Sequence, residues 1–447
     1  MEHIFREYDI RGIFQKDLNE TSVKAIGYKL GSEILKVGKS VAVGEDARTH
    51  SPTIANWLMS GLNEAGIKVY YMGLVPTPCN YFAGFSEEHI DATIMITGSH
   101  NPKEYNGFKI TIKKLPFFGK ELKALGKKVE ENRVKILSKP LFSSINTKES
   151  YIDFLVTHFK KLKGLKNSIA IDCGNGAAGE VVRAVVDKLE LNATLLYEKP
   201  DGNFPNHHPD PSIEENLKDL KELLKTHEIG FAFDGDADRL AVLTSSYNIV
   251  ADELVVIFAK TMENPQILGE VKCSSIMYDE VDKIGNSFMY KTGHSNIKMK
   301  MQELNIDIAT EVSGHIFFAD RYYGYDDAIY AMLRVLELIK DGVNLNKEYE
   351  KLPKTYKTAE IKVKTTEKKK FKIIDELKKT LQNPPKGFPT IKELITIDGV
   401  RIVFENGWGL IRASNTTPDL VTRFEANSKE DLRLYQKVLG EVLLQKL

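Results

Sequence analysis

The stretch ATIMITGSHNP, residues 92–102, joins an apolar run to a polar turn and shows how the chain is built. The apolar run has the pattern of a buried strand, and similar runs precede it at residues 41–44 and 67–72. An amphipathic helix is predicted between those two runs, at residues 52–65. Because strands that alternate with helices are typical of α/β units, the N-terminal third is predicted to be one α/β domain.

The alternation continues to about residue 340. A second unit is predicted to open with a helix at residues 151–162 and a strand at 168–172, and to end after a strand at 241–243. A third unit runs from a helix at residues 252–262 to a helix at 328–340. A chain of 447 residues is too long for one core, so several α/β domains are expected.

The last part of the chain has a β-rich pattern. Strands are predicted at residues 359–363, 400–405 and 408–412. Asn406-Gly407 separates the last two, and Asn-Gly between two strand patterns is a strong hairpin signal. The three lysines at residues 368–370 precede a predicted helix, and we interpret them as a solvated face.

Charge and cysteine content narrow the class of partner and the compartment. Lys plus Arg and Asp plus Glu number 62 each, so no net charge favours nucleic acid or an anionic membrane. A small-molecule partner is expected. Cys79, Cys173 and Cys273 form no Cys-x-x-Cys pair, and no apolar run is long enough to span a membrane. We predict a cytoplasmic protein without disulfides.

Three aspartates follow the apolar run at residues 231–233 at alternate positions: Asp234, Asp236 and Asp238. Gly235 allows the loop to fold so that the carboxylates converge, and their mutual repulsion calls for a hard divalent cation, most simply Mg²⁺. An EF-hand loop is excluded because its sixth and twelfth positions hold Arg and Ser. A solvated acidic turn is the alternative interpretation.

Ser99 follows its strand directly and is flanked by Gly98 and His100, an arrangement that exposes a hydroxyl nucleophile. A serine hydrolase is disfavoured because its Gly-x-Ser-x-Gly elbow would require glycine where Thr97 and Asn101 stand. Lys109 could approach the serine from the next strand, although such a lysine is more often a surface residue.

Two further loops are rich in polar groups. Residues 411–418, IRASNTTP, offer a guanidinium, an amide and hydroxyls after a strand, as a phosphate site requires. Residues 311–315, EVSGH, offer an acceptor, a hydroxyl and an imidazole, which suit vicinal sugar hydroxyls. An ordinary polar turn is the alternative for each loop.

A glycine-rich segment supports a competing interpretation. Residues 174–179, GNGAAG, follow a strand and open a helix, and Glu198 lies about 20 residues further on, as in a dinucleotide-binding fingerprint. Asp172 argues against it, because this carboxylate would face the pyrophosphate. We favour close strand-to-helix packing and keep a nicotinamide-dependent oxidoreductase as an alternative.

The serine, acidic, sugar-type and phosphate loops occur in an order that resembles the α-D-phosphohexomutase superfamily over the whole chain. The TGSHNP and EVSGH loops and YGYDD at residues 323–327 are most similar to its bacterial phosphomannomutase/phosphoglucomutase branch. Phosphoglucosamine mutases, the alternative within the superfamily, usually carry Ala and Gln where this chain has Gly98 and Val312. Thr310 departs from the glycine that is usual before the sugar loop.

The resemblance implies an α/β fold with four domains around a central cleft. The first three would be α/β domains with mixed sheets, and the last a smaller α+β domain. A Lys-rich, weakly patterned stretch at residues 120–150 marks the first boundary. The expected domains are residues 1–145 with the serine loop, 146–248 with the metal loop, 249–352 with the sugar loop and 353–447 with the phosphate loop.

The resemblance also implies residue roles. Ser99 would be the phosphorylated serine and would share Mg²⁺ with Asp234, Asp236 and Asp238. The reacting phosphate would be flanked by Arg11, His100 and Lys109. Lys109 would carry a proton, with its pKa lowered by neighbouring cations. The substrate would be bound by Tyr8, Arg239, Lys291, His294, Glu311, Ser313 and His315. The non-reacting phosphate would be held by Arg412, Ser414, Asn415 and Thr416.

The activity so implied is interconversion of hexose 1-phosphate and hexose 6-phosphate, of mannose, glucose or both. It would proceed through a phosphoserine and a hexose 1,6-bisphosphate. The expected partners are sugar phosphates, without nucleic acid or membrane, and the expected state is a monomer, with a dimer possible. A non-catalytic sugar-phosphate binding protein is the remaining alternative.

Overall fold

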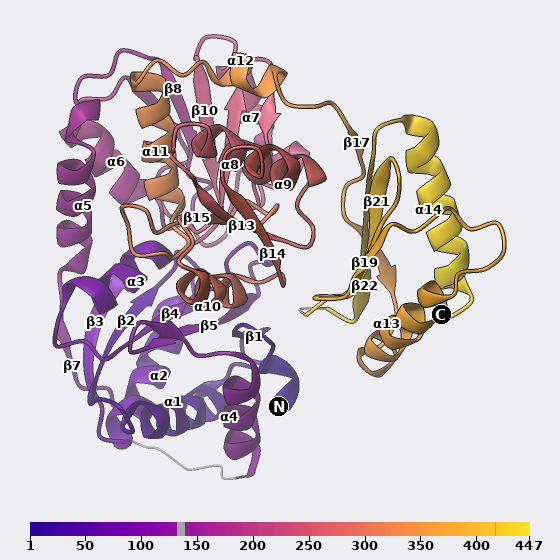
Figure 1. Cartoon of the computed structure of the whole chain (residues 1–447). Helices are drawn as coiled ribbons and strands as arrows, with labels where there is room; N and C mark the ends of the chain where they lie inside the picture. The colour runs from indigo at the N-terminus through magenta and orange to yellow at the C-terminus, as the bar shows by residue number, and fades with distance from the viewer. Residues whose placement is uncertain (132–138, 416) are drawn as a thin grey trace.

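The computed structural model describes residues 1–131, 139–415 and 417–447. Its strands form four separate sheets, each built from a successive part of the chain. We refer to these parts as domains I to IV; β12 (Asn248–Ile249) crosses the proposed boundary after residue 248 and is counted with domain II. Figure 1 shows domains I to III packed together and domain IV (orange to yellow) standing to one side.

Domain I is a mixed sheet covered by helices. Its elements are η1 (Glu2–Ile4), β1 (Ile10–Ile13), α1 (Glu20–Ile34), β2 (Ser40–Glu45), α2 (Ser51–Glu64), β3 (Lys68–Leu74), α3 (Thr77–Ser86), β4 (Ala92–Ile96), β5 (Tyr105–Ile112), β6 (Leu115–Pro116), α4 (Gly119–Glu131) and β7 (Phe142–Ser144). The strand order is β1-β5-β4-β2-β3-β7, with β6 on β5. β4, β2, β3 and β7 are parallel, whereas β5 is antiparallel to its neighbours.

Helix α4 corrects the prediction that the stretch from residue 120 is weakly patterned. Leu122, Leu125 and Val129 are buried at helical spacing and pack into the core of domain I. This narrow apolar stripe was not recognised in the sequence, because the lysines between its residues dominate the local composition.

Domain II follows with a second mixed sheet. Its elements are α5 (Thr147–His158), η2 (Lys160–Leu162), β8 (Ile169–Asp172), α6 (Gly179–Lys188), β9 (Ala193–Leu196), η3 (Glu214–Leu217), α7 (Lys218–Leu223), β10 (Ile229–Phe233), β11 (Leu240–Thr244) and β12 (Asn248–Ile249). The strand order is β12-β11-β10-β8-β9. β10, β8 and β9 are parallel, and β10 turns into the antiparallel β11.

Domain III repeats this plan on a smaller scale. Its elements are α8 (Ala251–Ala259), β13 (Gln266–Glu270), α9 (Ser275–Val281), β14 (Asn286–Tyr290), α10 (His294–Leu304), β15 (Ile308–Thr310), β16 (Ile316–Phe318), α11 (Ala328–Lys340) and α12 (Leu345–Glu350). The strand order is β14-β13-β15-β16, and only the β15–β16 pair is antiparallel. Helix α11 occupies the residues that the sequence predicted.

Domain IV has an antiparallel sheet with two helices. Its elements are β17 (Tyr356–Lys357), β18 (Ile361–Lys364), α13 (Glu367–Gln382), β19 (Glu393–Ile395), β20 (Val400–Val403), β21 (Gly407–Ala413), β22 (Asp419–Ala426) and α14 (Lys429–Leu444). The predicted hairpin joins β20 to β21, and the N–H of Phe404 donates to the carbonyl of Gly407 at 2.8 Å. Three mixed α/β domains and a smaller α+β domain confirm the predicted fold class.

The domains do not share their cores equally. One apolar cluster runs from the α3 side of domain I through domains II and III, whereas domain IV has a cluster of its own. A small group of buried side chains joins domain IV to domain III: Val271, Trp408 and Leu410. The three cysteines are buried and free. In the described ranges, no helix combines the length and apolar character needed to cross a membrane.

Candidate active site

Four polar loops begin where strands end: after β4, β10, β15 and β21. They contain most of the side chains that the sequence singled out. Tertiary structure joins the first two loops directly. The hydroxyl of Ser99, after β4, donates to Asp234 Oδ2, after β10, at 2.9 Å.

Ser99 is held in an unusual backbone conformation. It is almost fully buried, and its φ of 49° lies in the left-handed region that few non-glycine residues adopt. Its Oγ also lies 3.1 Å from His100 Nδ1. The surrounding protein and the positive charges of Arg239 and Arg11 lower the pKa of His100, so its imidazole is neutral. The serine hydroxyl thus lies between a carboxylate and a neutral base.

The three aspartates of the β10–β11 loop converge as predicted. They are fully buried, and one oxygen from each lies within 4.8 Å of the others. Burial and the charges of its two neighbours raise the pKa of Asp234 well above its usual value. One oxygen of Asp236 and one of Asp238 are buried without a hydrogen-bond partner. Three converging oxygens with unused lone pairs fit a hard divalent cation.

Lys109 binds this carboxylate group from β5. Its ammonium donates to Asp236 Oδ2 at 2.6 Å and to Asp238 Oδ2. Burial alone would lower the pKa of Lys109, but Asp236 and Asp238 outweigh it and raise the pKa. The prediction that neighbouring cations lower this pKa is therefore wrong, because the groups in contact with Lys109 are carboxylates.

Close backbone approach explains two sets of glycines around these loops. A Cβ on Gly235 would lie 2.6 Å from the carbonyl oxygen of Ser99. In the glycine-rich segment, a Cβ on Gly176 would lie 2.7 Å from the Gly235 carbonyl oxygen, and one on Gly179 only 1.7 Å from that of Glu198. Gly176 thus packs against the metal loop and Gly179 against the chain at Glu198, which agrees with the close packing favoured for this segment.

The sugar-type loop lies between β15 and β16. Glu311 is buried and its Oε1 accepts from the N–H of Gly293 at 2.6 Å, while Ser313 is half-buried. Gly314 has a φ of 103°, and its carbonyl accepts from Leu240 at 3.0 Å. The loop is therefore tied to the strand that leaves the metal loop.

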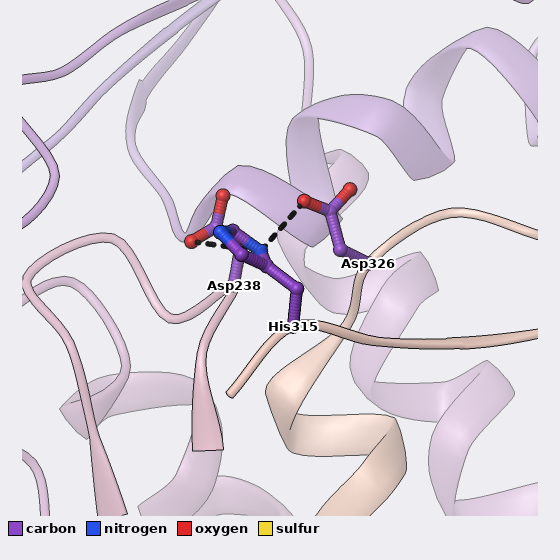
Figure 2. A group of neighbouring side chains, drawn as sticks. All are labelled: Asp238, His315 and Asp326. Carbon is purple, nitrogen blue, oxygen red and sulfur yellow. Dashed lines mark ion pairs between the residues drawn. The ribbon is translucent and has the colours of Figure 1, made fainter. Parts of the chain in front are cut away.

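His315 connects the sugar loop to the aspartates, as Figure 2 shows. Its Nδ1 lies 3.0 Å from Asp326 Oδ2 and 3.8 Å from Asp238 Oδ1, and its Nε2 accepts from Arg239 Nε at 3.0 Å. Asp326 is fully buried and also accepts from Lys298 Nζ at 3.0 Å. Sequence reasoning assigned no role to Asp326 or Lys298. Only the YGYDD motif drew attention to Asp326.

Tyr8 and His294, two further substrate candidates, lie near each other. The ring centroids of Tyr8 and His294 are 6.2 Å apart, and the Tyr8 hydroxyl donates to the carbonyl of Thr292 at 2.6 Å. His294 Nδ1 lies 3.9 Å from Asp326. Arg11, a catalytic candidate, donates to the carbonyl of Gly98, next to Ser99, and to Asp9.

The phosphate loop follows β21 in domain IV. Arg412 is buried, its Nε donates to Asp398 Oδ2 at 3.0 Å, and its Nη2 has no partner within the described protein. Asn415 donates its side-chain N–H to the Tyr8 hydroxyl of domain I. Thr416 lies outside the described residues. A buried guanidinium nitrogen without a partner fits an anionic ligand.

Lys370 corrects the interpretation of residues 368–370 as a solvated face. Its side chain is only 2% exposed, and its Nζ donates to the carbonyls of Ser414 and Thr417 at 2.7 and 3.0 Å. The helical period turns this lysine inward and its two neighbours outward. Lys370 thereby fixes the backbone of the phosphate loop.

A cavity of about 300 Å³ lies between domain IV and domains I and III. Lys291 lies in its wall together with Asn296, Asp398, Gly399 and Asn415. Ala413, at the start of the phosphate loop, lies in the same wall.

Comparison with known proteins places these loops in a family. Models of the phosphoglucomutase/phosphomannomutase α/β/α domains I, II and III match residues 2–134, 149–246 and 250–356, and the model of the C-terminal domain matches 360–440. The chain is 40% identical to a phosphomannomutase/phosphoglucomutase of Pseudomonas syringae pv. tomato, over 97% of this chain and 94% of that protein.

Two further similarities agree with this match. A phosphoglucomutase of Neisseria gonorrhoeae is 38% identical over 98% of this chain and 96% of that protein. The crystal structure of a phosphoglucomutase/phosphomannomutase family protein from Burkholderia thailandensis has a TM-score of 0.90 and 35% identity, covering 100% of this chain and 98% of that one.

Proposed function

This chain belongs to the phosphoglucomutase/phosphomannomutase family, and on that premise we propose that it interconverts hexose 1-phosphate and hexose 6-phosphate. The substrates are phosphates of mannose, of glucose or of both, because the chain is similar to a phosphomannomutase/phosphoglucomutase and to a phosphoglucomutase. The contact between the Ser99 hydroxyl and Asp234 carries the proposal. It joins a nucleophile to a cluster of carboxylates that suits a cation.

Asp234, Asp236 and Asp238 would hold Mg²⁺, with a phosphate oxygen on Ser99 completing its ligands. All three residues offer hard carboxylate oxygens, which this cation prefers. When bound, Mg²⁺ supplies charge stabilisation to the transferring phosphoryl group. Lys109 links two of these aspartates to domain I and adds a fixed positive charge beside them.

We assign the chemistry to the resting phosphoserine. A hydroxyl oxygen of the bound hexose phosphate forms a bond to phosphorus as the bond from phosphorus to Ser99 Oγ breaks, and the hydroxyl proton passes to the Ser99 oxygen, which yields a hexose 1,6-bisphosphate. The bisphosphate then reorients in the cleft, and its other phosphoryl group is transferred back to Ser99. His100, in contact with Ser99 Oγ, can take the serine proton in this second transfer. Arg11 stands beside the same loop.

The binding roles of the other groups are proposed from the family resemblance. Glu311 and Ser313 would bind sugar hydroxyls in both orientations of the bisphosphate. The phosphate that is not reacting would be held by the domain IV loop: Arg412, Ser414, Asn415 and Thr416. Five further residues would line the sugar: Tyr8, Arg239, Lys291, His294 and His315. We further propose a cytoplasmic enzyme that acts as a monomer.

One experiment tests the reaction and its nucleophile together. Purified enzyme is assayed with Mg²⁺, a trace of glucose 1,6-bisphosphate, and glucose 1-phosphate, mannose 1-phosphate or glucosamine 1-phosphate in parallel. We expect turnover of the first two and a phosphoryl group on the peptide that contains Ser99. Ser99→Ala should abolish both, whereas Ser245→Ala, at an exposed serine, should change neither.

Other outcomes identify the alternatives. Preference for glucosamine 1-phosphate would indicate a phosphoglucosamine mutase. Binding of hexose phosphates without exchange of label would indicate a non-catalytic binding protein. Activity that needs a nicotinamide cofactor and survives Ser99→Ala would indicate an oxidoreductase.

A further inference from the structure

A buried ion pair lies directly beneath the serine loop, where β2 ends. It joins Asp46 to Arg48, which are 3% and 1% exposed. We propose that these two are positioning residues for Ser99, holding its backbone so that the hydroxyl meets Asp234. The inference rests on the proposed function, since it concerns the nucleophile of that reaction. The sequence drew attention to neither residue.

Asp46 fixes the chain that enters the loop. Its Oδ2 accepts from the N–H of Gly98 at 3.0 Å and from the Thr97 hydroxyl at 2.8 Å. Thr97 Oγ1 in turn accepts from the N–H of Ser99 at 2.7 Å. The other carboxylate oxygen of Asp46, Oδ1, accepts from Ser51 Oγ at 2.6 Å, so both carboxylate oxygens of Asp46 are occupied. The amide of Ser99 is thus tied to Asp46 through one hydroxyl.

Arg48 fixes the chain that leaves the loop. Its Nη2 donates to the carbonyls of Ser99 and Asn101 at 2.9 and 2.6 Å, and its Nη1 donates to that of Pro102 at 2.7 Å. Its Nε faces Asp46 Oδ2 at 3.2 Å. A planar guanidinium presents several donors in one rigid fork, which a lysine ammonium cannot reproduce. One side chain therefore holds three backbone carbonyls between Ser99 and Pro102.

The contacts of Asp46 and Arg48 hold the unusual backbone conformation of Ser99. Ser99 has its φ in the left-handed region, and a residue keeps such a conformation only where its surroundings impose it. Its amide is held through Thr97 and its carbonyl through Arg48, so both peptide groups next to the strained torsion are fixed. The side chain is then directed at Asp234.

Neighbouring glycines show that the Arg48 side chain is closely packed on two sides. A Cβ on Gly98 would lie 2.2 Å from Arg48 Nε, so this position has room for no side chain while Arg48 is in place. From domain II, a Cβ on Gly202 would lie 2.6 Å from Arg48 Cα, and the Phe204 ring centroid is 5.4 Å from the guanidinium carbon. Arg48 is thereby enclosed between the serine loop and domain II.

The first test substitutes the arginine. Arg48→Ala is expected to lower kcat about 100-fold, the size of effect that a shift of about 1 Å in a reacting group can cause, with KM for glucose 1-phosphate within about threefold. Arg48→Lys should recover part of the lost kcat. Arg334→Ala is the matched control, because Arg334 is a buried arginine paired with Asp320 outside the serine loop. It should lower stability and leave kcat within about twofold of wild type.

The second test is a double-mutant cycle with Gly98→Ala. In the wild-type background the new methyl group meets the guanidinium, and kcat should fall at least about tenfold. In the Arg48→Ala background that obstacle is gone, so Gly98→Ala should change kcat less than about twofold. Independent, additive losses would overturn the proposal.

Amide hydrogen exchange supplies a readout that needs no activity. In Arg48→Ala, peptides covering residues 97–102 should exchange at least about tenfold faster, while peptides of domain IV keep their wild-type rates. Unchanged exchange in the serine loop would overturn the positioning role. If the wild-type protein shows no mutase turnover yet the loop loosens in Arg48→Ala, the proposed function fails while the structural role of Arg48 stands.

Discussion

The serine and metal loops differ from the phosphate loop in how they are anchored. Asp236 in domain II accepts from Thr77 Oγ1 at 2.5 Å and from Lys109 at 2.6 Å, both in domain I. These loops stand on an apolar cluster that runs through domains I to III. The phosphate loop stands on the separate cluster of domain IV, which Figure 1 shows at the side of the molecule.

The difference matches what each part must do. Phosphoryl transfer requires a nucleophile and its stabilising charges in fixed geometry, which several buried contacts across a shared core can supply. A phosphate clamp that serves two substrate orientations needs freedom to open and close. Domain IV meets domain III through a small apolar group and through Arg401, whose Nη1 donates to the carbonyls of Val271 and Cys273 at 2.7 Å. Even so, each loop is shaped by a buried cation that donates to backbone carbonyls: Arg48 for one and Lys370 for the other.

The strongest challenge to this contrast is Asp236→Asn. It removes a charge that joins the metal loop to domain I and one proposed cation ligand, so kcat/KM should fall by at least about 3 kcal/mol, more than a hundredfold. Steady-state kinetics with glucose 1-phosphate measures the loss. Asp187→Asn, at an exposed aspartate of α6, is the control. Wild-type rates in Asp236→Asn would contradict the assigned role.

Arg412→Ala probes the opposite side of the cleft. Loss of the clamp's guanidinium should lower kcat/KM by about 3 kcal/mol, mostly through a higher KM, because the contact is made with substrate in every state. The split between kcat and KM separates it from Asp236→Asn. If both variants lose only kcat, the two loops do not have the separate tasks proposed for them.

The pH dependence of stability should differ between domains I to III and domain IV. Burial raises the pKa of Glu45, at the end of β2, to about 7, above its ordinary value of 4.5. The folded state therefore binds this proton more tightly, so its contribution to stability is complete below pH 4.5 and is lost as pH rises through 7. Between pH 5 and pH 7 the loss should be about 2 kcal/mol.

Urea unfolding at these two pH values measures this effect. Glu45→Gln should remove about 2 kcal/mol of the pH dependence from the transition of domains I to III. The transition of domain IV should be unaffected. An identical pH dependence in wild type and Glu45→Gln would rule out the protonated buried carboxyl.

The smallest expected effect concerns the joint between domains III and IV. Val271→Ala removes two buried methyl groups there and should lower stability by about 1.5 kcal/mol. Domain IV should then unfold at a lower urea concentration than the rest. In a Trp57→Phe background, the fluorescence of Trp408 follows that step, since these are the two tryptophans of the chain. Val256→Ala, in the shared core, is the matched control and should not separate domain IV.

Local sequence patterns predicted the parts of the site that each lie within one loop. The alternate spacing of Asp234, Asp236 and Asp238 was enough to predict convergence, because a single short loop carries all three. Asn406-Gly407 predicted its hairpin for the same reason. Lysine-rich composition misled us twice, at α4 and at Lys370, because composition does not show which side of a helix is buried.

Local patterns could not predict contacts between distant segments, and the meeting of Ser99 with Asp234 was expected only from the family resemblance. Lys109 was expected among cations and lies among carboxylates, since its surroundings come from a loop of another domain. Asp46 and Arg48 went unnoticed because nothing in their sequence shows that they lie beneath residues 97–102. His315 acquires its partner Asp326 in the same way.

The sequence by itself determined the order of the four loops, the residue types that they carry and the α/β pattern that supports them, because these depend on neighbours along the chain. Only the tertiary structure decided which charges meet, how Ser99 is held and why domain IV stands apart. Burial and long-range packing set those features, and neither is a property of a local stretch of residues.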